Sequence, residues 1–119
     1  MGGSVKVYIA GPIAGHEDLN KPEFDRASKM LTYLGHTPIN PLDIAPLDHP
    51  TYSHSCLGDP TQGGHGYGCY MIPDLRALLG CQGYTLLRGW AQSRGATVEE
   101  TVAKICGLTY IDTLDMDSC

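Results

Sequence analysis

Apolar residues along the chain fall into short runs typical of strands and longer stretches with helical spacing. Runs rich in β-branched and aromatic residues predict strands at residues 5–10, 37–40, 83–87 and 108–111. Apolar residues three and four positions apart predict helices at about 22–34, 70–79 and 95–106. Strands that alternate with helices form right-handed βαβ units and a parallel sheet. We therefore expect a single-domain α/β fold of the Rossmann-like or flavodoxin-like kind, with about four to five strands flanked by helices.

A few residues define the ends and inner faces of the predicted helices. Pro22 suits the first helical position, and Gly35 suits the end of the same helix. Pro73 to Arg76 are expected to open the middle helix. The side chains expected to face the core are Phe24, Ala27, Leu31 and Leu34 in the first helix and Leu75, Leu78 and Leu79 in the middle one.

Residues 42–68 interrupt this pattern, because they are rich in Gly, Pro and His and show no sustained period. A stretch of this length within a compact domain is usually a functional lid or a disordered insert. The segment and its border contain residue types that bind zinc, at no standard zinc spacing. They are His49, His54, Cys56, His65 and Cys69. Free surface side chains are favoured, so no metal and no cofactor is expected; a zinc site that mediates an interaction is the alternative.

The composition fits one folded cytoplasmic domain. Hydrophobic residues make up 42% of the 119 residues and charged residues 18%, which is typical of a chain that folds around one core. A net charge of −5 without a basic run argues against nucleic acid as a partner. No apolar run could span a membrane, and no signal peptide is evident. Five cysteines without a CxxC motif favour reduced thiols in the cytoplasm.

The segment Ser93 to Glu100 leads from the third strand into the last helix and could bind an anion. A helix start offers N–H groups and a positive dipole end, and Gly95 permits close approach of a ligand, while Arg94 adds a cation. The alternative is purely structural, because Thr97-x-x-Glu100 matches a capping box, and Glu100 can also pair with Lys104.

Glu99 fits the structural alternative less well than Glu100 does. Its neighbours at helical spacing are Ala103 and Cys106, which are small and apolar, so its carboxylate should be partly desolvated. From spacing alone, a capping or solvated role for Glu99 is slightly favoured over a catalytic one.

Two other segments could contribute to a site at the carboxyl ends of the strands. Gly11 to Gly15 is either a tight turn or a backbone cradle for a sugar or phosphate. Asp74 is either a first-turn carboxylate stabilised by the helix dipole or an acid that protonates a leaving base. Tyr67, Tyr70 and Trp90 are each either packing residues or aromatic rings that stack on a base.

The order and spacing of these motifs resemble those of the nucleoside 2-deoxyribosyltransferase superfamily, and the nearest likeness is to short phage-type members of unassigned function and to nucleotide N-glycosidases. The resemblance covers most of the chain except residues 42–68. The matching residues are Tyr8 to Pro12, Gly35-His36, Asn40-Pro41, Asp74-Leu75, Leu87 to Trp90, Ser93 to Ala96 and Glu99.

The resemblance implies roles for these residues. Glu99 would attack the anomeric carbon of the sugar, Tyr8 would orient Glu99, and Asp74 would act on the sugar hydroxyl or the leaving base. Phosphate- and substrate-binding roles would be taken by Gly11, Pro12, Ile13, Asn40, Trp90, Ser93, Arg94 and Gly95. The superfamily also implies a homo-oligomer. Its transferases usually carry another Asp after the third strand, where this chain has Arg88 to Trp90, so hydrolysis is favoured over transfer.

The sequence therefore predicts an enzyme that cleaves the N-glycosidic bond of a nucleoside 5′-monophosphate through a covalent glycosyl-Glu99 intermediate. Its partner would be a small nucleotide or nucleoside. The alternative is a protein that binds a nucleotide or a nucleotide signal without turning it over.

Overall fold

The computed structural model describes residues 4–13, 16–45 and 67–114. Within them, a single sheet contains β1 (Lys6–Ala10), β2 (Thr37–Ile39), β3 (Gly83–Leu86) and β4 (Thr109–Tyr110). The strand order is β2-β1-β3-β4, and each neighbouring pair is parallel. The helices are α1 (Lys21–Tyr33), α2 (Tyr67–Leu79) and α3 (Arg94–Ile105), joined by short 3-10 turns η1 (Glu17–Asn20), η2 (Pro41–Asp43) and η4 (Trp90–Gln92). The predicted α/β fold with a parallel sheet is confirmed.

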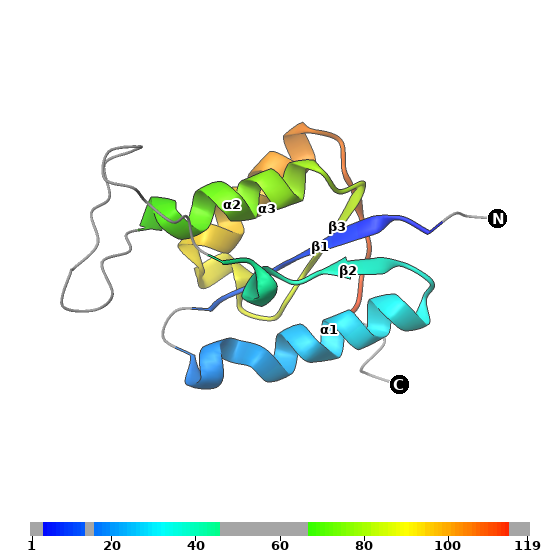
Figure 1. Cartoon of the computed structure of the whole chain (residues 1–119), viewed down its shortest axis with the longest axis horizontal. Coiled ribbons are helices and arrows are strands. Elements are labelled where there is room, and N and C mark those ends of the chain that lie inside the picture. Colours follow the sequence, from blue (N-terminus) through cyan, green and yellow to red (C-terminus); the bar gives the residue numbers. More distant parts are fainter. Residues whose placement is uncertain (1–3, 14–15, 46–66, 115–119) are drawn as a thin grey trace.

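The helices cover the sheet in two layers, with α1 on one face and α2 and α3 on the other (Figure 1). Side chains of β1 alternate between the layers, as a strand requires. Val7 and Ile9 pack with Phe24 of α1, whereas Tyr8 and Ala10 belong to the core formed with α2 and α3. Burial on both faces explains why β1 is almost continuously apolar.

The direction in which successive strands are added to the sheet reverses between β1 and β3. After β1 the chain moves through α1 to β2 on one side, and it then returns through α2 to β3 on the other side of β1. In open parallel sheets, ligands bind at such a switch point, beyond the carboxyl ends of the strands. The segments at this position are residues 11–13 after β1 and residues 87–93 after β3.

The first helix ends as predicted. Gly35 has a φ of +89°, which glycine adopts without strain, and the N–H of His36 donates to the carbonyl of Leu31 at 2.9 Å. Phe24, Ala27 and Leu31 are fully buried. Leu34 is 37% exposed, contrary to the prediction, because it lies at the C-cap, where the chain turns away from the core.

The middle helix starts earlier than predicted. Pro73 lies inside α2, which begins at Tyr67, so Asp74 is not a first-turn carboxylate next to the positive end of the dipole. Leu78 is fully buried and Leu75 packs against the core, whereas Leu79 is 58% exposed. Consecutive helical residues are rotated by about 100°, so Leu78 and Leu79 cannot both face inward.

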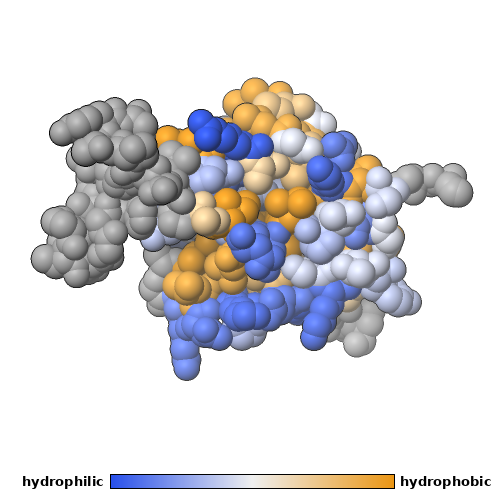
Figure 2. Space-filling model, in the orientation of Figure 1, coloured by the Kyte–Doolittle hydropathy of each residue, from blue (hydrophilic) through white to orange (hydrophobic). Residues whose placement is uncertain are grey.

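Polarity differs between the two helical layers at the surface. Figure 2 shows hydrophilic residues along α1 at the lower edge and more apolar residues over α2 and α3. Exposed apolar side chains of the latter layer include Leu79, Val98 and Ile105. Within the described part of the chain, no helix has the length and apolar character that a membrane span requires.

Candidate active site

The most specific contact between predicted site residues joins β1 to α3. The hydroxyl of Tyr8 donates a hydrogen bond of 2.7 Å to Oε2 of Glu99, and the two residues are 91 positions apart in the sequence. Tyr8 is fully buried and Glu99 is only 5% exposed. A short hydrogen bond between a buried hydroxyl and a buried carboxyl fixes the orientation of that carboxyl. The structure thus excludes the solvated role for Glu99.

Asp74 of α2 is the second buried carboxyl of this helical layer, with 8% of its surface exposed. Its charge acts on both Glu99 and Tyr8, so the three groups form one electrostatic cluster. Helix α2 packs against α3, which positions the two carboxyl-bearing residues on neighbouring helices. We refer to Tyr8, Asp74 and Glu99 as the carboxyl cluster.

Burial determines the protonation of the carboxyl cluster. Desolvation raises the pKa of Glu99 to about 8; the hydrogen bond from Tyr8 lowers this pKa, and the nearby charge of Asp74 raises it. Desolvation also raises the pKa of Asp74 to about 6. The pKa of the Tyr8 hydroxyl is raised, first by burial and then by the charge of Glu99, so Tyr8 remains a hydrogen-bond donor. Two neighbouring acids with different pKa values are typical of catalytic sites.

Glu99 reaches the cluster because of where α3 begins. Ser93 is the N-cap, and its Oγ accepts a hydrogen bond of 3.2 Å from the N–H of Ala96. The predicted capping box is wrong: Thr97 lies inside α3 and donates to the carbonyl of Arg94 at 2.8 Å. The predicted pair between Glu100 and Lys104 is confirmed at 3.1 Å.

The apolar stripe expected beside Glu99 is shorter than predicted. Ala103 is fully buried one turn after Glu99, but Cys106 is exposed because it is the C-cap beyond the last turn of α3. Desolvation of Glu99 comes instead from Ala103 on its own helix and from the packed core that contains Tyr8 and Ala96.

The loops after β1 and β3 lie against each other at the switch point. A Cβ on Gly11 would lie 2.6 Å from Cδ1 of Leu87, so only glycine allows this approach. Gly89 has a φ of +83°, and a Cβ at this position would lie 3.5 Å from Cγ of Pro12. Trp90 follows, partly buried against the core that contains Tyr8. These contacts bring the predicted binding segments together on the side of the sheet where α3 starts.

Arg88 lies in the loop after β3. Its Nη1 lies 3.7 Å from Oε1 of Glu23, on α1. The same carboxylate oxygen contacts Nη2 of Arg26 at 3.4 Å. Arg88 therefore interacts with the α1 layer, on the face of the sheet opposite to the carboxyl cluster.

The turn that holds the loop after β1 was not predicted from the sequence. Asp18, Leu19 and Asn20 have consecutive positive φ values of 53°, 55° and 61°, which are strained for residues with a Cβ. The side-chain amide of Asn20 donates to the carbonyl of Pro12 at 2.9 Å and so ties this turn to the predicted binding loop. Asn is among the residues that tolerate this conformation best, which was the available signal.

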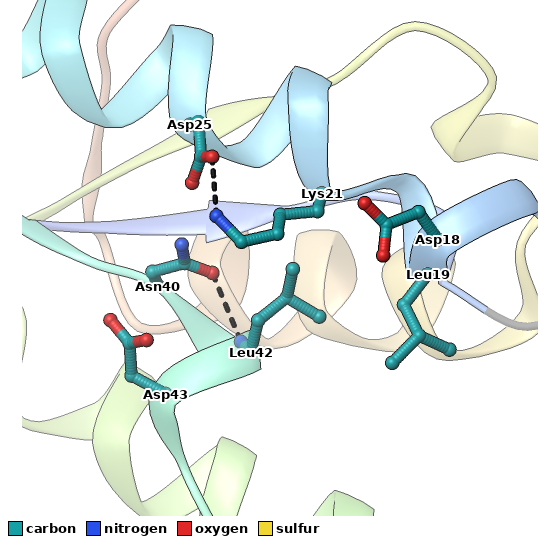
Figure 3. Close-up of a pocket in the computed structure, with 7 residues that line it drawn as sticks. All are labelled: Asp18, Leu19, Lys21, Asp25, Asn40, Leu42 and Asp43. Carbon is teal, nitrogen blue, oxygen red and sulfur yellow. Dashed lines mark hydrogen bonds and ion pairs between the residues drawn. The ribbon is translucent and has the colours of Figure 1, made fainter.

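Asn40 lies apart from the carboxyl cluster. Its Oδ1 accepts from the N–H of Leu42 at 3.0 Å, which caps η2. Figure 3 shows it in a pocket with the ion pair between Lys21 and Asp25, and Leu42 packs in the α1-side core. Ile13 packs in the same core. Asn40 and the Ile13 side chain are thus on the other side of the sheet from Glu99.

Several predicted features lie outside the described residues. They include Ala14 and Gly15 of the first loop and His49, His54, Cys56 and His65 of the insert. Cys69 is described and fully buried. Within the described ranges, no three residues of the His, Cys, Asp and Glu types are grouped in a way that could hold a metal ion.

The fold and the cluster define an α/β protein with a parallel sheet and a pair of buried carboxyls close to its switch point. A family model described as "Domain of unknown function (DUF4406)" matches residues 5–112. The chain belongs to this family. No curated protein and no solved structure matches the chain.

Proposed function

We propose that this protein cleaves the N-glycosidic bond of a nucleoside 5′-monophosphate, by hydrolysis or by exchange of the base. The observation that supports this proposal best is the buried hydrogen bond between Tyr8 and Glu99, with Asp74 close enough to act on both. An oriented, desolvated carboxylate suits attack on an anomeric carbon with oxocarbenium character, and a second carboxyl suits protonation of the leaving base.

In the proposed reaction, Oε1 or Oε2 of Glu99 forms a bond with the anomeric carbon while the bond from that carbon to the base nitrogen breaks. Its electron pair goes to the base, which receives a proton from Asp74. Water, or a second base, then displaces Glu99 from the sugar. Tyr8 keeps its proton throughout and holds the carboxyl of Glu99 in place.

The substrate would span the switch point. The start of α3, with Ser93, Arg94 and Gly95, provides a favourable end of the helix dipole for a phosphate. Gly11 and Pro12 would approach the sugar, and Trp90 would contact the base. This assignment follows the resemblance of the sequence to nucleotide N-glycosidases. The proposed location of the protein is the cytoplasm, and its proposed assembly is a homo-oligomer.

Incubation of the purified protein with a panel of ribo- and deoxyribonucleoside monophosphates tests this proposal. We expect release of free base from at least one monophosphate, and slower release from the matching nucleoside, because the nucleoside lacks the phosphate contacts at α3. Chromatography of the products measures both rates. Tight nucleotide binding by calorimetry, with no base released after long incubation, would instead support the alternative of a nucleotide-binding protein.

A further inference from the structure

The carboxyl cluster contains two buried acids, Asp74 and Glu99. Among the residues that the structure describes, Glu99 has one hydrogen-bond partner, the neutral hydroxyl of Tyr8, and the ion pairs involve neither Glu99 nor Asp74. Burying an ionised carboxylate without a counter-ion is costly, and burying two that repel each other is more so. The cluster should therefore retain protons that exposed carboxylates release.

The surroundings of the two acids differ, which determines where a single proton lies. Glu99 comes from α3, is 5% exposed and is affected by the charge of Asp74. Asp74 comes from α2 and is 8% exposed. Among the residues that the structure describes, the titratable groups that act on the pair are Tyr8 from β1 and, through its effect on Tyr8, the thiol of Cys81 beyond the end of α2. Neither of these groups carries a positive charge, so the proton stays within the carboxyl pair. Burial raises the pKa of Glu99 to about 8 and that of Asp74 only to about 6, so the proton lies on Glu99.

We propose that Asp74 and Glu99 share one proton in the resting protein, which Glu99 holds and which passes through Asp74 to the leaving base. The second half of this inference rests on the proposed function. A proton moves from Glu99 to Asp74, which leaves Glu99 as the carboxylate that attacks the anomeric carbon and Asp74 as the acid. When the bond to the base breaks, that proton goes to the base nitrogen.

The second half-reaction restores the proton. Asp74, now a carboxylate, takes a proton from water as the water oxygen bonds to the anomeric carbon. The bond from that carbon to Glu99 breaks, Glu99 leaves as a carboxylate, and the proton returns to it from Asp74. One water molecule is consumed per bond cleaved, and no other reactant is needed.

The shared proton implies a window of pH for activity. Below about pH 6 both acids are protonated, so Glu99 cannot attack. Above about pH 8 both are ionised, so no proton is available for the base. The one-proton state dominates between these values, and a profile of kcat/KM with a maximum near neutrality follows.

Infrared spectroscopy of the full chain at different pH values tests the proton directly and needs no substrate. At neutral pH we expect the carbonyl stretch of a buried carboxylic acid, absent from Glu99→Gln and unchanged in Glu100→Gln. In Asp74→Asn the band should persist with a lower titration midpoint, because the charge that opposes ionisation of Glu99 is gone.

The absence of this band from the native protein at neutral pH would overturn the inference, and so would a titration midpoint that Asp74→Asn leaves unmoved. These results are distinct from a failure of the proposed function. A protein that shows the band but releases no base from any nucleotide keeps the shared proton and loses the glycosidase assignment.

Discussion

Replacement of Glu99 by glutamine is expected to lower kcat for base release on the order of a thousand-fold or more, because the carboxamide cannot form the glycosyl intermediate. Gln matches Glu in shape and still offers an oxygen that accepts the hydrogen bond from Tyr8, which is 2.7 Å in the native protein. The loss should therefore fall on kcat, with little change in nucleotide affinity. Steady-state kinetics and calorimetry measure the two effects separately.

The neighbouring residue provides a matched control for this variant. Glu100→Gln removes an adjacent, partly buried carboxylate that pairs with the exposed Lys104 and has no place in the proposed mechanism, so its kcat should stay close to the native value. Equal losses in both variants would show that the charge of the α3 start, and not the carboxyl at position 99, supports activity. Near-native kcat in Glu99→Gln would remove Glu99 from the mechanism.

Stability gives an independent check that Glu99→Gln folds. Burial raises the pKa of Glu99 to about 8 in the folded protein, so its contribution to stability is fully present below its ordinary pKa and is lost as the pH rises through about 8. Gln cannot ionise and avoids this loss. At pH 9, above this pKa, the melting temperature of Glu99→Gln should therefore exceed that of the native protein by more than it does at pH 5.

Replacement of Asp74 by asparagine is expected to lower kcat about 100- to 10,000-fold for nucleotides with a neutral base, since such a base leaves poorly without a proton. The loss should be much smaller for a nucleotide whose base is already cationic, such as N7-methylguanosine monophosphate, because that base leaves as a neutral molecule. Comparing rates of base release for the two kinds of substrate measures this difference.

A carboxylate far from the cluster controls for general effects of charge removal. Asp25→Asn changes an exposed pair with Lys21 on α1, on the other face of the sheet, and should leave both rates near the native values. An equal loss on neutral and cationic bases in Asp74→Asn would contradict the role of Asp74 as the acid. It would favour a role in holding the sugar.

The sequence predicted the fold well where apolar spacing determines the structure. Strand β1 is buried on both faces and α1 carries its core residues at regular intervals, so both could be located without tertiary information. The start of α2 could not be located in this way, because proline usually marks the first turn of a helix, whereas Pro73 lies within α2. The capping-box pattern also placed the N-cap of α3 at Thr97, whereas Ser93 is the N-cap in the structure.

The burial of Glu99 was predictable from the sequence, but its contacts were not. The spacing of Glu99 and Ala103 indicated partial burial, and the fold brings Tyr8 to Glu99 across 91 positions of sequence. That pairing depends on α3 packing against β1 and β3, which no local pattern specifies. The separation of Asn40 from Glu99 also depends on the fold, because Asn40 lies with α1 in the pocket of Figure 3.

The most direct test of the central claim is a crystal structure of the Glu99→Gln protein with a nucleoside 5′-monophosphate bound. We predict that the anomeric carbon lies about 3–3.5 Å from the side-chain oxygen at position 99, the distance expected of a complex ready to react. The phosphate should lie at the start of α3, near Ser93 and Gly95. A sugar held away from position 99, for example in the pocket beside Asn40, would contradict the account.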